Sequence, residues 1–172
     1  ALRPLLRSGE RTVTGRASAL LVAFIFALDQ YTKHLVVASW NLGESLPVIP
    51  GFFSLTHLRN RGGAFGLFSD LPETWRVAFF VVFAIATVAA LIWMLRTTAR
   101  NDVLQRLALT AVIGGAAGNL YDRVRYGEVV DFLDVYVRDW HWPAFNVADS
   151  FISCGVVLLL LSSLMPARRD EG

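Results

Sequence analysis

Residues 114–132 read GGAAGNLYDRVRYGEVVDF, and residues 145–150 read FNVADS. The first stretch begins as a small-residue apolar helix and ends on polar residues, and both stretches place aspartates beside long apolar runs. A carboxylate is costly to place next to a membrane-length apolar segment, so such aspartates are functional candidates. The candidates here are Asp122, Asp131 and Asp149.

The composition indicates an integral membrane protein. Hydrophobic residues make up 55% of the 172 residues and the mean hydropathy is +0.49, above the roughly 45–50% apolar share of soluble domains. The net charge of +2, without a basic stripe, argues against nucleic-acid binding. The single cysteine, Cys154, excludes a disulfide framework and a cysteine metal cluster, and its apolar surroundings predict a packing role.

Four apolar segments are long enough to cross a membrane. We expect helices at about 17–39, 73–95, 103–122 and 147–165, which together form a transmembrane domain over 17–165. A basic tail at 1–16 and a short tail at 166–172 flank this domain. Arginines gather in the two tails and in the loop between the second and third helices, so the positive-inside rule places both termini in the cytoplasm.

The two longer connectors, at 40–73 and 124–146, then lie outside the cytoplasm. The first is broken by prolines and glycines, and Phe52 to Leu58 has strand character. We expect an all-α membrane fold with a small extracytoplasmic β-element and an interfacial loop or short helix. The glycines at 62, 63 and 66 further suggest that residues 59–68 form a mobile flap.

Polar residues recur at helical spacing. Asp29 and Lys33 share one helical face, either as a salt bridge that lets the helix carry two charges or as a pair that faces and orients a polar site. Asn119 and Arg123 share a face in the same way. Asn60 is either a turn residue or an amide directed into the site.

Among the residue types that can carry catalysis, the aspartate carboxylates are the remaining candidates. The histidines are scattered, and neither a His-Glu-x-x-His motif nor a Gly-x-Ser-x-Gly elbow is present. Two aspartates that share a proton can activate water and protonate a leaving amine. Asp131 has no adjacent cation, whereas Asp149 begins a helix that it could merely cap. Asp122 precedes Arg123 and fits a structural brace, so Asp131 and Asp149 are the favoured pair.

Five ordered blocks resemble the bacterial lipoprotein signal peptidase (signal peptidase II) family. They are Asp29-Gln30-x-Thr32-Lys33, Arg59-Asn60-x-Gly62, Gly114-Gly115-Ala116-x-Gly118-Asn119-x-x-Asp122-Arg123, Val129-Val130-Asp131-Phe132 and Phe145-Asn146-x-Ala148-Asp149-Ser150. The resemblance implies an intramembrane aspartyl endopeptidase that cuts prolipoproteins before a diacylglyceryl-modified cysteine. Block matching assigns catalysis to Asp131 and Asp149. It assigns substrate-binding or orienting roles to Asp29, Lys33, Asn60, Gly62, Asn119, Arg123 and Asn146.

The resemblance also implies the setting. The expected partners are lipid-modified prolipoproteins, membrane phospholipids and peptide-like inhibitors of the globomycin type, and the expected state is a monomer without metal or cofactor. The expected location is the bacterial inner membrane, with the site near the outer leaflet. Gly63 stands where the family often has alanine. The sequence leaves open which aspartate acts first as the base.

Two other functions compete with this interpretation. A metal-dependent phospholipid head-group transferase would use an aspartate cluster, but its leading Asp-x-x-Asp-Gly half is absent. A proton- or cation-coupled carrier would need a polar path, but four helices without an internal repeat do not favour one. The residues concerned are Asp122, Gly127, Asp131 and Asp134 for the first function, and Asp29, Lys33 and Asp131 for the second.

Overall fold

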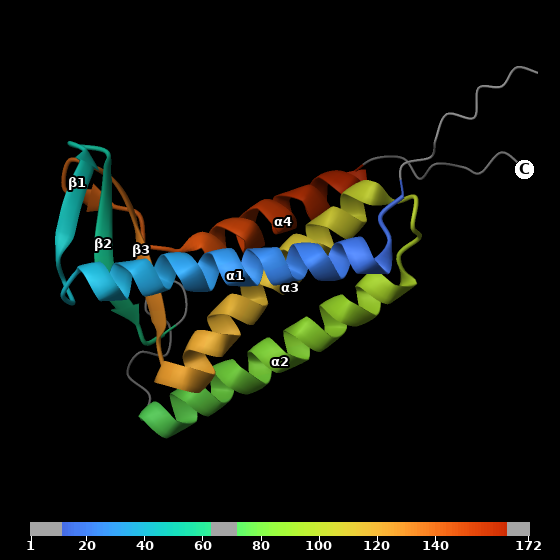
Figure 1. Cartoon of the computed structure of the whole chain (residues 1–172), viewed down its shortest axis with the longest axis horizontal. Helices are drawn as coiled ribbons and strands as arrows, with labels where there is room; N and C mark the ends of the chain where they lie inside the picture. The colour runs from blue at the N-terminus through green and yellow to red at the C-terminus, as the bar shows by residue number, and fades with distance from the viewer. Residues whose placement is uncertain (1–11, 63–71, 165–172) are drawn as a thin grey trace, which may run out of the picture.

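The computed structural model describes residues 12–62 and 72–164. This part of the chain forms four helices and a small sheet (Figure 1). The helices are α1 (Gly15–Ser39), α2 (Glu73–Thr97), α3 (Val103–Tyr126) and α4 (Val147–Leu164). The strands are β1 (Ser45–Ile49), β2 (Phe53–Asn60), β3 (Val129–Val137) and β4 (Trp140–His141).

All four helices are long and apolar enough to cross a membrane, as the sequence predicts. Even α4, the shortest at 18 residues, spans roughly 27 Å, close to the thickness of the hydrocarbon layer. Large apolar side chains such as Phe24, Phe83 and Leu160 are exposed on α1, α2 and α4, where lipid can cover them. Helix α3 is mostly buried and packs against the other three helices (Figure 1).

Glycines on α3 permit this close packing. A Cβ atom at Gly115 would collide with the backbone carbonyl oxygen of Ala148 on α4. A Cβ atom at Gly118 would collide with the carboxylate of Asp29 on α1. Small residues allow membrane helices to approach in this way. The two glycines therefore bring α1 and α4 onto the end of α3 that carries the polar residues.

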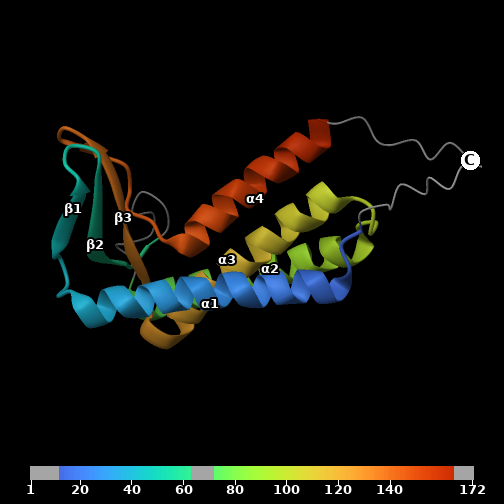
Figure 2. The same cartoon turned by 45° about the horizontal axis from the view of Figure 1, so that its top comes forward.

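The sheet lies at one end of the helices (Figure 2). It is antiparallel, with strand order β1-β2-β3-β4. Strand β3 follows α3 directly, because Gly127 ends the helix in a left-handed conformation with φ of 73°. In the pairing of β2 with β3, Leu58 lies opposite Asp131, next to a bulge that begins at Leu55. The expected β-element is confirmed, and it includes the apolar frame around Asp131.

One expectation about the elements differs from the structure, and another is tested only in part. The sequence predicts a helix that ends at Asp122, but α3 continues to Tyr126 because no residue before Gly127 breaks it. The sequence also predicts a short interfacial helix within 40–73. The described part of that connector, residues 40–62, contains a hairpin and no helix, since β1 and β2 occupy it. Residues 63–71, which hold the rest of that connector and most of the predicted flap, lie outside the described residues, so the interfacial helix and the flap stay predictions there.

The packing of α3 on α4 can be tested at Gly115. The substitution Gly115→Ala should lower the midpoint of thermal unfolding in detergent, because overpacking against the Ala148 carbonyl costs about 1–3 kcal/mol. The matched control is Gly15→Ala, since nothing lies within 4 Å of a Cβ atom at that helical position. An unchanged midpoint for Gly115→Ala would show that the two helices do not pack this closely.

Candidate active site

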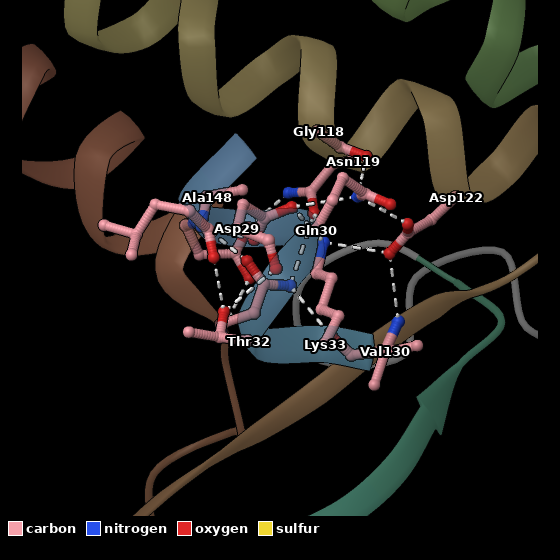
Figure 3. A network of polar contacts seen from close by, with 12 residues as sticks. Asp29, Gln30, Thr32, Lys33, Gly118, Asn119, Asp122, Val130 and Ala148 are labelled. Atoms are coloured by element: carbon pink, nitrogen blue, oxygen red, sulfur yellow. Dashed lines mark hydrogen bonds and ion pairs between the residues drawn. The ribbon is translucent and has the colours of Figure 1, made fainter. Parts of the chain in front are cut away.

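A buried lysine, Lys33 of α1, is the centre of a polar network at the sheet end of the bundle (Figure 3). Its Nζ lies 2.8 Å from Oδ2 of Asp29 and 2.8 Å from Oδ2 of Asp122 on α3. The same Nζ donates to Oδ1 of Asn119 at 3.0 Å. The exposed fractions of Lys33, Asp29 and Asp122 are 3%, 0% and 1%, so each charge depends on its partners.

Gln30 completes this network, and the sequence prediction missed it. Its Nε2 donates to Oδ1 of Asp122 at 2.9 Å and to Oδ2 of Asp29 at 3.1 Å. The other oxygen of Asp29 accepts the backbone N–H of Ala148 on α4 at 2.9 Å, and Oδ2 of Asp122 accepts that of Val130 on β3 at 3.3 Å. We call Asp29, Gln30, Lys33 and Asp122 the Lys33 cluster; it joins α1, α3, β3 and α4.

Asp122 pairs with Lys33 and not with the adjacent Arg123. Consecutive helical residues point about 100° apart, so neighbours in sequence seldom meet. The Arg123 guanidinium instead donates to the backbone oxygen of Gly62 at 3.4 Å and lies 4.9 Å from the centre of the Phe80 ring on α2. Asp122 is therefore a buried member of the cluster, and Arg123 connects α3 to the end of β2.

Asp131 on β3 and Asp149 on α4 line one cavity of about 990 Å³. Both oxygens of Asp131 accept side-chain amides: Oδ2 from Asn60 at 3.0 Å and Oδ1 from Asn146 at 2.7 Å. Oδ1 of Asp149 accepts from Nδ2 of Asn119 at 2.7 Å. Three of the residues that the sequence selects as orienting groups thus contact the two aspartates that it selects as a pair.

Asn146 also begins α4. Its Oδ1 accepts the backbone N–H of Asp149 at 2.9 Å, and Oδ2 of Asp149 accepts the backbone N–H of Asn146 at 3.3 Å. This reciprocal exchange is a capping box. Asp149 therefore caps its helix with one oxygen and uses the other to accept from Asn119 beside the cavity. Helix capping therefore explains the contact of Oδ2 but not the contact of Oδ1 with Asn119.

A hydrogen bond to the side-chain oxygen fixes the orientation of each of these three amides. Oδ1 of Asn119 accepts from the Lys33 ammonium, and Oδ1 of Asn60 accepts from the backbone N–H of Gly62 at 3.1 Å. Oδ1 of Asn146 is held by the capping box. An ammonium and a backbone N–H can only donate, so each amide oxygen must face them. Each NH₂ group is then directed at a carboxylate.

Asp131 is electrostatically unusual. Burial raises the pKa of its carboxyl to about 7, and the nearby Asp149 carboxylate acts in the same direction. The hydrogen bonds from Asn60 and Asn146 oppose this shift without cancelling it. Asp131 therefore stays protonated at pH values where an exposed aspartate is ionised. A neutral acid next to a second carboxyl group is the arrangement that proton-sharing hydrolysis needs.

The rest of the cavity wall is largely apolar. It includes Trp142, Phe145 and Ile152 close to the acid pair. Cys154, predicted to be a packing residue, is exposed and lines the same cavity, because it lies one helical turn after Ser150, which also lines it. The cavity combines a polar floor with walls that suit an apolar ligand.

The residues of the two competing functions do not come together as those functions need. Asp122 is bound to Lys33, and Asp134 lies 2.9 Å from Nδ1 of His141. Asp131 has its own amide partners, so these aspartates do not form one cation cluster. The Lys33 ammonium is likewise held between Asp29 and Asp122.

Comparison with known proteins gives a consistent result. A family model described as signal peptidase (SPase) II matches residues 21–165. A lipoprotein signal peptidase of Syntrophotalea carbinolica is 49% identical over 156 residues, which cover 91% of this chain and 96% of the relative. The corresponding enzyme of Solibacter usitatus is 46% identical over 149 residues, covering 87% and 91%.

Two solved structures share the fold. A bacterial membrane enzyme determined by the in meso method at 2.3 Å resolution has a TM-score of 0.80 and 33% identity, covering 90% of this chain and 91% of its own. A second, at 1.9 Å resolution, has a TM-score of 0.79 and 33% identity, covering 90% and 97%. The family model and the relatives together cover most of the chain, including both aspartates of the cavity. The chain belongs to the signal peptidase II family.

Proposed function

We propose that the protein removes signal peptides from diacylglyceryl-modified prolipoproteins, with Asp131 and Asp149 as its catalytic pair. The observation that carries the assignment is the convergence of these two carboxyl groups, from a strand and a helix, on one cavity. Membership of the signal peptidase II family supports the reaction and the substrate class. The chemistry requires no cofactor or metal, because water and two carboxyl groups supply every proton transfer.

The raised pKa of Asp131 supports the following first roles within the pair. Asp149, as carboxylate, accepts a proton from a water molecule whose oxygen attacks the scissile carbonyl carbon. Asp131, as carboxylic acid, protonates the carbonyl oxygen, which gives a tetrahedral diol. The diol then returns a proton to Asp131 while Asp149 protonates the leaving nitrogen and the C–N bond breaks. One water is consumed, and both carboxyl groups regain their initial protonation states.

The surrounding residues position the reactants. The amides of Asn60, Asn119 and Asn146 hold the two carboxyl groups in place. Arg123 and Gly62 lie at the cavity wall, where they can bind the extended peptide backbone. The apolar wall accepts the lipid-bearing side of the substrate from the membrane. Peptide-like inhibitors of the globomycin type would occupy the same space.

The same proposal includes the orientation in the membrane. The sheet end, with the cavity, faces the outer leaflet of the bacterial inner membrane, and both termini lie in the cytoplasm. Support comes from the opposite end, where Arg16, Arg96 and Arg100 are gathered near the start of α1 and the connection between α2 and α3. A monomer suffices for this site, since one chain supplies both carboxyl groups.

The direct experiment is a cleavage assay on a prolipoprotein peptide with and without diacylglyceryl on its cysteine. The purified full-length protein in lipid should cut only the modified peptide, immediately before that cysteine. Equal cleavage of the unmodified peptide would contradict the proposed substrate class.

Removing either carboxyl group should abolish catalysis. Asp131→Asn and Asp149→Asn should each lower kcat by at least roughly a thousandfold, because neither remaining group can both accept and donate the required proton. The double variant should be little worse than either single one. The control is Asp139→Asn, an exposed aspartate in the turn between β3 and β4. Substantial activity in either folded single variant would refute the pair.

Asp122 should behave as a structural acid. Asp122→Asn should destabilise the protein by about 3 kcal/mol or more, because it unbalances a buried ion pair. Cleavage per folded molecule should remain close to normal. Asp102→Asn is the matched control on the same helix, since asparagine caps a helix as well as aspartate does. A stable but inactive Asp122→Asn protein would assign Asp122 to the catalytic machinery.

The pH dependence follows from the raised pKa of Asp131. Since the acid must be protonated in the free enzyme, kcat/KM should fall as the pH rises through about 7. In Asp149→Asn the pKa of Asp131 should fall, because its negative neighbour is gone. Infrared titration of the protonated carboxyl band, with the double variant as a blank, measures this shift. A kcat/KM that keeps rising up to pH 9 would be incompatible with Asp131 as the acid.

A further inference from the structure

A second cavity, of about 250 Å³, lies between the sheet-end halves of α1 and α3. It is separate from the acid pair, although Arg59 of β2 lines both cavities. Its wall includes the exposed His34 of α1 and the exposed Tyr121 and Tyr126 of α3. Part of the Lys33 cluster forms its floor. The proposed hydrolysis makes no use of this cavity.

Arg59 has donors to spare at this cavity. Its side chain is only 18% exposed, and its Nε lies 3.8 Å from the Glu128 carboxylate, beyond hydrogen-bond range. The guanidinium also lies 5.5 Å from the centre of the Tyr126 ring. Within residues 12–62 and 72–164 it donates no hydrogen bond, although a guanidinium carries five N–H donors. The unused N–H donors of this largely buried guanidinium can therefore bind an anion in the cavity.

Two further arginines, Arg61 and Arg125, contact groups next to the cavity but do not line it. Arg125 lies 5.4 Å from the centre of the same Tyr126 ring and donates from Nε to its hydroxyl at 3.1 Å. Arg61 shares Glu128 with Arg59, at 3.4 Å from Nε. Glu128 is thus shared by Arg59 and Arg61, while Arg125 contacts Tyr126. The Lys33 cluster, with two carboxylates and one ammonium, carries one net negative charge, so these three guanidiniums, Glu128 and the cluster together leave one positive charge in excess.

The depth of the cavity indicates the source of the anion. Its α1 wall runs from Gln30, about 13 Å before the helix terminus at Ser39, to Val37, about 3 Å before it. The helix terminus is at the level where phospholipid headgroups begin. Exposed tyrosines such as Tyr121 favour this level. Towards the membrane centre, Tyr121 packs edge-on against Phe26 at 5.7 Å. The polar cavity is therefore followed, on the side of the membrane centre, by the aromatic pair Phe26 and Tyr121.

We propose that this cavity binds the headgroup phosphate of an anionic phospholipid. Arg59 supplies the charged donors within the cavity, because a planar guanidinium matches phosphate oxygens in pairs, and Arg125, bound to the Tyr126 hydroxyl, adds a second positive charge beside it. The Tyr126 hydroxyl already accepts from Arg125, so its own proton is free to be donated to the phosphate. The volume suits a headgroup, while the acyl chains remain in the bilayer alongside α1 and α3. This binding rests on membrane insertion and not on peptidase activity.

Lipid titration of the purified full-length protein in detergent tests the proposal. Phosphatidylglycerol should raise the midpoint of thermal unfolding, and phosphatidylcholine should not. Arg125→Gln should weaken the apparent affinity for phosphatidylglycerol about fivefold, as expected for one arginine near a lipid phosphate. Tyr126→Phe should weaken it while keeping the ring that both arginines stack on. In Arg59→Gln/Arg125→Gln the response should be lost.

The control variant is Arg100→Gln, which removes the same charge at the opposite end of the helices and should respond as the original protein does. Each shift in the unfolding midpoint is measured relative to the same variant without lipid. If the double variant does not fold, the phosphatidylglycerol responses of Arg125→Gln and Tyr126→Phe test the proposal. An equal response to phosphatidylcholine would overturn the proposal. So would equal protection by inorganic phosphate alone, or an unchanged phosphatidylglycerol response in the arginine variants.

Discussion

An ammonium group placed between membrane-spanning helices must be neutralised, and the site is arranged around the way Lys33 meets this requirement. Two carboxylates and one amide oxygen surround its Nζ, and they come from α1 and α3. The same carboxylates accept backbone N–H groups from β3 and α4. Four elements are thereby fixed by one buried charge. The amide oxygen that Lys33 holds belongs to Asn119, whose NH₂ group contacts Asp149, so Lys33 orients the amide that meets this carboxyl group.

Close helix packing and the buried charges depend on one another. The Asp29 carboxylate occupies the place where a side chain at position 118 would begin, so the ion cluster needs glycine there. Gly115 likewise lets the first turn of α4 lie against α3. That turn contains Asp149 and the N–H of Ala148 that Asp29 accepts. Neither glycine lines the cavity, yet both determine where Asp149 and the Lys33 cluster lie.

Local pattern was sufficient for the helices, because apolar runs are visible along the chain. It also selected two aspartates that line one cavity, because isolated carboxylates stand out beside such runs. It was not sufficient for β3, whose residues 129–133 read as an apolar frame and become a strand only by pairing with β2. The partner of Asp122 was also missed, since Lys33 is remote in sequence while Arg123 is adjacent. Gln30 was overlooked for the same reason. A glutamine within a charged motif shows its role only when a second helix supplies the acceptor.

Asn146 has a consequence for drug resistance. Its side chain holds Asp131 and at the same time forms the cap that starts α4, so a substitution there loses both functions. Asn119 is similarly divided between Lys33 and Asp149. A compound that binds through these amides leaves a bacterium little room for escape, because each resistant variant would lose the enzyme with the drug. The apolar wall leaves more room for change, because a side chain such as Ile152 can change size without breaking a hydrogen bond. Compounds that rely least on that wall should therefore keep their potency longest.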